Sequence, residues 1–295
     1  MSFLKKGDKI GIIAPSVGLK DKDINPSLKY FKKLGLIPVL ADNLEKSYRY
    51  MAGTDKERAD SINKMFADSS IKALFCLRGG AGATRMLPYL DYNLIKKNPK
   101  PIIGLSDSTA IQNALFAKSA NPSLTGFLPI YDLNDKKLDK EVDKSLQTAL
   151  FENKHQITSG KSLIKGTTEG EIIGGCLSVF LYLCGTPYMP DFKDKILILE
   201  DIEEKTYKVD LMLNQLKQQK NFNKLKGIIF GAFTDCPIID PEDGTIEDCI
   251  KDFTKGLNVP VVTDFAYGHI PSRHIIPLGI KAKLTATAGK CTLTW

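Results

Sequence analysis

The sequence predicts an α/β protein with an N-terminal doubly wound parallel sheet domain, which carries a nucleophile-type elbow, and a smaller β-rich C-terminal domain. Apolar runs of strand length alternate with helical patterns through the first half of the chain. A polar, glycine-containing stretch then interrupts this pattern, and alternating strand patterns follow it. With 295 residues, the chain is long enough to form two domains, each with its own core.

The first half reads as a series of strand-helix units. We expect strands at residues 10–14, 37–40, 71–77 and 102–105, and helices at residues 24–34 and 54–66 and after residue 106. Thr54 and Glu57 form a capping box at the start of the second helix. Repeated units of this kind imply a parallel sheet with helices on both faces, whose ligands bind beyond the carboxyl ends of the strands.

The second half has a different pattern, which suggests a domain boundary. We assign residues 1–150 to the N-terminal domain, residues 151–170 to a connector and residues 171–295 to the C-terminal domain. Within the connector, Leu163 and Ile164 make too short an apolar run to form an element. Beyond it, we expect strands at residues 195–199, 227–233 and 259–265, a helix around residues 209–216 and a terminal hairpin that turns at Ala288 and Gly289.

Composition argues against several classes of protein. The net charge of +7 is modest, and the lysines alternate with acidic residues, so a nucleic-acid-binding surface is not expected. The six cysteines form no Cys-x-x-Cys pair and lie mostly in apolar runs, as reduced core residues do. We find no signal peptide and no membrane-spanning stretch, and we therefore expect a cytoplasmic protein without a membrane partner.

Ser106 occupies the most informative position in the chain. The segment PIIGLSDSTAIQNA predicts a strand that turns at Gly104 into a helix, with Ser106 at the tip of the turn. This geometry exposes the serine hydroxyl and points the first N–H groups of the helix toward an anion that forms during attack on a carbonyl. The alternative is that Ser106 caps the helix, as serine often does at this position.

A serine nucleophile needs a base, and the chain has only three histidines. His155 lies in the polar connector, where we expect a solvated side chain. His269 lies in a glycine-flanked loop that leaves a strand, where catalytic side chains are often presented. His274 could join His269 in a metal site, but the carboxylate or cysteine ligands of a zinc site are missing nearby, so we predict neither a metal nor an organic cofactor.

Glu200 is the best candidate for the acid that orients the base. It ends the apolar strand KILILE, where a carboxylate is partly buried and needs a partner. That partner could be His269. An ion pair with Lys205 or Lys208, or a capping role before the next helix, explains Glu200 equally well at this stage.

Four segments, taken in order, carry a family resemblance. They are RGGAGATRMLPYLD, GLSDSTAIQNAL, GEIIGGCLSVFLYLCGTPYMPDFKDKILILED and YGHIPSRHIIPLG. The chain closely resembles the serine LD-carboxypeptidases (muramoyltetrapeptide carboxypeptidases) of bacterial murein recycling, whose relatives include the microcin-C self-immunity peptidases. The resemblance implies that Ser106 is the nucleophile, His269 the base and Glu200 its orienting acid. It also implies a two-domain fold that usually forms a homodimer.

The implied reaction is acyl transfer from the bond between an L-centre and a terminal D-Ala. The oxyanion would be bound by the N–H of Asp107 and by one from Gly79 or Gly80. A carboxypeptidase also needs a cation for the terminal carboxylate of its substrate. Three arginines lie near the motif loops, and the sequence gives no basis for choosing among them: Arg78, Arg85 and Arg273.

The substrate is less well specified than the reaction. Ala81, Cys176 and Lys208 stand where relatives commonly have tyrosine, asparagine and arginine, so polar groups that could recognise a substrate differ here. We expect a peptidase acting on a murein tetrapeptide or a related small peptide, with its third-residue preference open. The alternatives are an immunity-type peptidase that cleaves aminoacyl-nucleotide analogues and a non-catalytic ligand-binding α/β protein.

Overall fold

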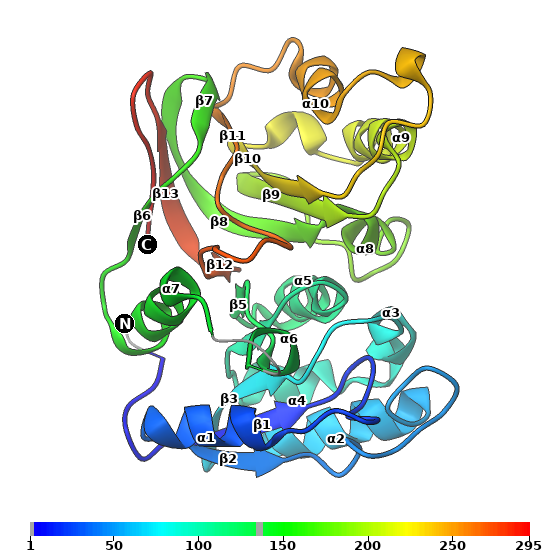
Figure 1. The fold of residues 1–295 in the computed structure, drawn as a ribbon, viewed down its shortest axis with the longest axis vertical. Coiled ribbons are helices and arrows are strands. Elements are labelled where there is room, and N and C mark those ends of the chain that lie inside the picture. The colour runs from blue at the N-terminus through cyan, green and yellow to red at the C-terminus, as the bar shows by residue number, and fades with distance from the viewer. Residues whose placement is uncertain (1–2, 134–137) are drawn as a thin grey trace.

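Two sheets, one above the other, form the framework of the molecule (Figure 1). The computed structural model describes residues 3–133 and 138–295. One sheet has six strands and the other has eight. Buried apolar side chains from both sheets join one continuous core. The predicted fold class, a parallel α/β sheet followed by a β-rich part, is confirmed.

The six-stranded sheet is parallel except at one edge. Its order is β12-β5-β4-β3-β1-β2, and β12 runs antiparallel to β5. The bounds are β1 Lys9–Ile13, β2 Ile37–Leu40, β3 Ile71–Cys76, β4 Ile102–Gly104, β5 Ser123–Thr125 and β12 Ile276–Leu278. Four of these strands were expected from their apolar runs. The edge strand β12 was not, because its partner lies about 150 positions away in the sequence and only the folded chain brings the two together.

Helices cover the six-stranded sheet, as the alternating pattern predicts. Their bounds are α1 Asn25–Lys33, α2 Asp55–Ala67, α3 Ala83–Met86, α4 Tyr92–Lys97, α5 Ser108–Ser119, α6 Pro129–Leu133 and α7 Lys140–Phe151, with a short 3-10 turn at Leu87–Tyr89. The capping box at α2 is confirmed. Thr54 Oγ1 accepts from the N–H of Glu57, and Glu57 Oε2 accepts from the N–H of Thr54 at 2.9 Å.

The eight-stranded sheet has a parallel centre and antiparallel edges. Its order is β6-β14-β13-β8-β9-β10-β11-β7, with β8 to β11 parallel. The strand bounds are β6 Gln156–Thr158, β7 Lys161–Ile164, β8 Gly166–Cys176, β9 Lys195–Ile202, β10 Gly227–Thr234, β11 Val261–Thr263, β13 Lys281–Ala286 and β14 Cys291–Thr294. The helices of this half are α8 Leu177–Leu181, α9 Thr206–Lys217 and α10 Ile246–Thr254. Short 3-10 turns lie at Phe222–Lys224 and Pro241–Asp243. The predicted terminal hairpin is confirmed as β13 and β14.

The segment at residues 151–170 is not the irregular connector we expected. It contains β6, β7 and the start of β8, and Leu163 and Ile164 lie within β7. These short strands form because β14 and β11 supply pairing partners that are remote in sequence. The expectation of a solvated His155 is also wrong. Its backbone exchanges two hydrogen bonds with Trp295, and the two rings stack at 4.8 Å, which buries the histidine.

Helix α5 joins the two halves of the molecule (Figure 1). Asn113 donates to the carbonyl of Gly174 at 2.8 Å and accepts from its N–H at 3.0 Å. Thr109 Oγ1 accepts from the N–H of Cys176 at 3.1 Å. A side chain at Gly175 would meet Thr109 Oγ1 at 2.5 Å, so the close contact of α5 with β8 requires glycine there. Within the described residues, no helix is both long enough and apolar enough to cross a membrane.

Candidate active site

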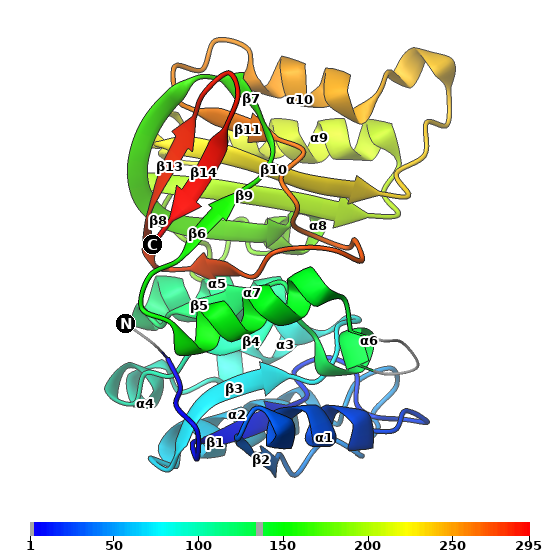
Figure 2. The same ribbon diagram turned by 60° about the vertical axis from the view of Figure 1, so that its left-hand side comes forward.

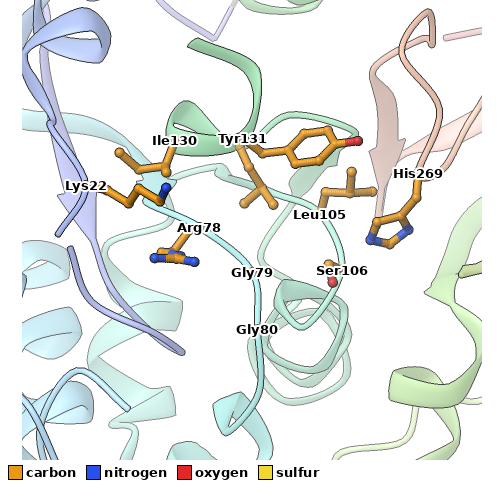
Figure 3. Close-up of a pocket in the computed structure, with 10 residues that line it drawn as sticks. Lys22, Arg78, Gly79, Gly80, Leu105, Ser106, Ile130, Tyr131 and His269 are labelled. Atoms are coloured by element: carbon orange, nitrogen blue, oxygen red, sulfur yellow. The ribbon is translucent and has the colours of Figure 1, made fainter. Parts of the chain in front are cut away.

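A cavity of about 370 Å³ lies beyond the carboxyl ends of the parallel strands, where an open α/β sheet binds its ligands. Both Ser106 and His269 line it, although they come from different halves of the chain (Figure 3). The remaining lining residues are Lys22, Arg78, Gly79, Gly80, Leu105, Leu128, Ile130 and Tyr131. No acidic side chain of the described residues lines this cavity.

Ser106 lies in the sharp turn between β4 and α5, as predicted. Its φ of +65° falls in the left-handed region, which a residue other than glycine occupies only when the surrounding structure enforces it. A side chain at Gly104 would meet Ser108 Cβ at 2.5 Å, so the turn can be this tight only with glycine. The capping interpretation of Ser106 is wrong. The N-cap position of α5 belongs to Asp107, and the Ser106 hydroxyl makes no hydrogen bond to any described residue.

Glu200 and His269 form a buried pair. The carboxylate has no exposed surface, and its Oε2 lies 2.7 Å from His269 Nδ1 and accepts from the His269 N–H at 3.1 Å. The alternative ion pairs are not formed, since the Lys208 ammonium lies near Glu204 instead, at 4.0 Å. Glu200 does not cap the next helix either, because the N-cap residue of α9 is Lys205. The contact through Nδ1 leaves Nε2 of His269 as the nitrogen available for proton transfer.

Burial and the neighbouring carboxylate act on His269 in opposite directions. Burial lowers the pKa of His269, whereas the hydrogen bond and negative charge of Glu200 raise it more, so the net pKa lies above its usual 6.5. The cationic form is therefore stabilised where a base needs it, after it has taken a proton. His269 and Ser106 do not hydrogen-bond to each other among the described contacts, but both line the same cavity (Figure 3).

Three backbone N–H groups beside Ser106 have no partner. Those of Asp107, Gly79 and Gly80 donate to no other described residue. Gly79 is in close contact with the serine, because a side chain there would meet Ser106 Cβ at 3.0 Å and Oγ at 3.1 Å. Free N–H groups next to a hydroxyl are the donors that an oxyanion needs.

The Asp107 side chain connects three loops around these donors. Its Oδ2 accepts from Ser16 Oγ at 2.5 Å and from the N–H of Ala83 at 2.8 Å. Burial raises the pKa of the Asp107 carboxyl, although the two hydrogen bonds act in the opposite direction. The loops after β1, β3 and β4 are thereby joined at one buried carboxylate.

The structure separates the three candidate arginines. Arg78 lines the cavity and makes no ion pair with a described residue. Arg85 lies outside the cavity lining, and its guanidinium bonds both carboxylate oxygens of Asp55 at 3.0 Å. Arg273 is 1% exposed and bonds both oxygens of Asp132, so it does not face the cavity.

Lys22 and Tyr131 also line the cavity, although no motif in the sequence pointed to either residue. Lys22 lies in the loop after β1, and Tyr131 lies on α6, after β5. The rule that all loops at the carboxyl edge of a parallel sheet meet at one crevice would have pointed to both loops. No cluster of three or more histidine, cysteine or acidic side chains suited to a metal ion occurs in the described ranges.

Comparison with known proteins assigns the family. Residues 10–126 match the LD-carboxypeptidase N-terminal domain, and residues 169–284 match the LD-carboxypeptidase C-terminal domain. The chain belongs to the LD-carboxypeptidase family. It is 32% identical to a probable murein peptide carboxypeptidase of Bacillus subtilis (strain 168), over 95% of this chain and 90% of that protein. The predicted family and the expectation of an enzyme are confirmed, and a non-catalytic ligand-binding protein is not favoured.

Two solved structures are similar over nearly the whole chain. A muramoyltetrapeptide carboxypeptidase from Oxalobacter formigenes has a TM-score of 0.90 and 28% identity, covering 97% of this chain and 98% of that one. An MccF-like protein from Bacillus anthracis str. Ames has a TM-score of 0.89 and 28% identity, covering 99% and 98%.

The raised pKa of His269 predicts the pH dependence of this family member. A protonated His269 cannot accept a proton, so kcat/KM should rise with pH through an apparent pKa above 6.5. Glu200→Gln removes the charge that raises this pKa, so the apparent pKa should fall, and kcat should drop on the order of 10⁴-fold. The measurement is kcat/KM from pH 5 to 9 for both proteins. An unchanged apparent pKa in the variant would contradict the assignment of His269.

Gly268 should be intolerant of substitution. At its φ of +114°, an alanine Cβ would lie 2.6 Å from Glu200 Oε2, the oxygen that binds His269. Gly268→Ala should lower the free energy of unfolding by about 1–3 kcal/mol and also lower kcat. Gly256→Ala is the matched control, because its φ is +82° but a Cβ there meets nothing within 4 Å. Denaturant unfolding and activity assays distinguish the two, and equal activity in both variants would refute the argument.

Proposed function

We propose that this protein is a serine LD-carboxypeptidase that releases the terminal D-Ala of murein tetrapeptides. The observation that carries the proposal is the Glu200–His269 pair, which opens onto the same cavity as Ser106 on its strained turn. A catalytic triad consists of an acid, a base and a hydroxyl group that come from separate elements. The acid contacts the base, and the base takes the proton of the hydroxyl. The names of the relatives, a probable murein peptide carboxypeptidase and a muramoyltetrapeptide carboxypeptidase, support the substrate class.

In the proposed reaction, His269 Nε2 takes the proton of Ser106 as Oγ bonds to the carbonyl carbon of the L-centre. The carbon–nitrogen bond to D-Ala then breaks, and His269 returns the proton to the leaving amine. Water repeats the sequence on the acyl-enzyme and releases the shortened peptide. Glu200 orients the imidazole and stabilises its cation. The missing Ser106–His269 hydrogen bond is compatible with this role, since such bonds often tighten only when substrate is bound.

The cavity contains groups for both charges of such a substrate. The free N–H groups of Asp107 and of Gly79 or Gly80 would bind the oxyanion. Arg78 would bind the terminal carboxylate, because Arg85 and Arg273 are already engaged by aspartates. Lys22 adds a second positive charge on the same side of the cavity (Figure 3).

The resemblance to the microcin-C self-immunity peptidases, with the similarity to the MccF-like protein, supports a second candidate function. In it, the same residues cleave an aminoacyl-nucleotide analogue. The reaction would again be acyl transfer from Ser106, with a different leaving group. The two functions differ in substrate and not in the proposed catalytic residues.

We also propose that the protein acts in the cytoplasm. The six cysteines are all free, and four of them are buried, which suits a reducing cytoplasm. A role in peptidoglycan recycling, a homodimer, the absence of a nucleic-acid partner and the division into domains at residues 1–150 and 171–295 stay predictions.

Ser106→Ala should abolish hydrolysis without unfolding the protein. Loss of the nucleophile in a serine hydrolase costs on the order of 10⁶ in turnover. The exposed Ser70→Ala is the matched control and should keep full activity. Activity is compared alongside circular dichroism, so that unfolding is detected separately. A Ser106→Ala protein with about a tenth of the original activity would rule out this nucleophile.

Selectivity for the L-centre is the test of substrate. The protein should release D-Ala from a murein tetrapeptide but leave the D-Ala–D-Ala bond of a pentapeptide intact. Inverting the acyl-side stereocentre displaces the carbonyl from Ser106, and a displacement of about 1 Å can cost on the order of 10²-fold. Free D-Ala is followed by mass spectrometry. Equal cleavage of both peptides would refute LD selectivity, and cleavage of neither, with turnover of an aminoacyl sulfamoyl-adenosine, would favour the second candidate.

A further inference from the structure

Arg273 is one of the most deeply buried charged side chains of the described residues, at 1% exposure, and it is surrounded by acceptors. Its Nε donates to the carbonyl of Gly126 at 2.8 Å, and one terminal nitrogen donates to the carbonyl of Ile270 at 2.9 Å. The other bonds Asp132 Oδ1 and Oδ2 at 2.6 and 2.7 Å. The planar guanidinium of arginine can donate to several separate acceptors at once, whereas the ammonium group of lysine cannot reproduce this geometry.

The acceptors of Arg273 belong to both halves of the molecule. Ile270 directly follows His269 in the loop that leaves the eight-stranded sheet, whereas Gly126 and Asp132 follow β5 of the six-stranded sheet. Asp132 lies on α6, and its Oδ2 also accepts from the N–H of Leu128 at 2.9 Å. Leu128, Ile130 and Tyr131 from the same segment line the cavity. The guanidinium thus joins the loop that carries the base to the segment that forms a cavity wall.

The chain runs from His269, in the loop that leaves one sheet, to β12 in the other, so the contacts of Arg273 between them bear on the position of His269. Among the described residues, the His269 side chain has one hydrogen-bond partner, Glu200 on β9 of the eight-stranded sheet. A few residues later the chain enters β12, which pairs with β5 next to the nucleophile strand β4 (Figure 2). Arg273 lies between these two attachments. Its bonds to Gly126 and Asp132 attach the loop to the segment after β5 at the point where the chain crosses from one sheet to the other.

We propose that Arg273, through its buried ion pair with Asp132, is a positioning residue that aligns His269 with Ser106. This inference rests on the proposed function, because it gives the Ser106–His269 distance a catalytic meaning. Neither Arg273 nor Asp132 lines the cavity, so neither touches the substrate there. Their effect is on the relative placement of two groups held by different sheets.

The test replaces both charges at once. A single substitution would leave a buried charge without a partner and could unfold the protein, whereas exchanging both partners for apolar groups is often neutral for stability. The variant is therefore Arg273→Met with Asp132→Leu. The matched control is Lys195→Met with Glu171→Leu, which removes a partly buried pair between β8 and β9 that touches neither His269 nor the cavity. A third protein, Arg273→Lys, keeps the charge without the fork.

Three measurements are made on each protein: kcat and KM for D-Ala release, the pH profile of kcat/KM, and the rate at which a fluorophosphonate labels Ser106. In the Arg273→Met, Asp132→Leu variant, kcat and the labelling rate should fall about 10²-fold, because a displaced base no longer meets the hydroxyl. The apparent pKa of His269 should stay above 6.5, because its contact with Glu200 remains and the lost Arg273 charge is one that lowers this pKa. The melting temperature should stay near that of the unmodified protein. Arg273→Lys should not rescue the rate, and the control should keep it.

The outcomes separate the two proposals. A folded double variant with kcat and labelling within about twofold of the unmodified protein would overturn the role of Arg273. If the unmodified protein is labelled but releases no D-Ala, the substrate proposal fails, and the labelling rates alone decide on Arg273. If the unmodified protein is not labelled at all, the assignment of Ser106 fails, and the inference about Arg273 fails with it.

Discussion

The buried contact between Glu200 and His269 is the interaction around which the site is arranged. A carboxylate without exposed surface persists as a charge only with a partner, and His269 supplies both its Nδ1 and its backbone N–H. Gly268 leaves room for the carboxylate, and Gly231 lets the same loop approach β10, where a Cβ would meet the Tyr267 carbonyl at 2.5 Å. Both contacts use Oε2, and Oε1 has no hydrogen-bond partner among the described residues, so the His269 loop is the carboxylate's hydrogen-bonded neighbour on one side.

The second constraint is the junction between the two sheets, because Ser106 and His269, the proposed nucleophile and base, belong to different ones. Asn113 and Thr109 bond α5 to the backbone of β8, and β12 extends the six-stranded sheet with residues that follow the His269 loop. Tyr267 reaches across as well, with its hydroxyl 2.9 Å from Thr125 Oγ1. These contacts are buried and hydrogen-bonded, and they fix the two halves next to each other, as the proposed reaction requires.

The elements that the sequence predicted well are those whose signals are local. The apolar run of β3, the capping box of α2 and the glycine–serine turn before α5 each depend on residues within a few positions of one another. The residues that were placed wrongly depend on distant partners. His155 is buried because β6 pairs with β14, and β7 forms because β11 is beside it. No local pattern reveals such pairings.

For the candidate site, the sequence by itself determined which residue types could act: one serine at a turn, one histidine that follows a glycine in a loop, and one glutamate at a strand end. These follow from local backbone shape, which nearby residues dictate. Only the tertiary structure decided among equals. In the folded chain, Glu200 contacts His269 and not a lysine. Arg273 and Arg85 form ion pairs with aspartates, whereas Arg78 lines the cavity. Which ion pairs form depends on which charges lie close together once the chain is folded. The spacing of two residues in the sequence does not give their distance in space, so the sequence alone could not identify these pairs.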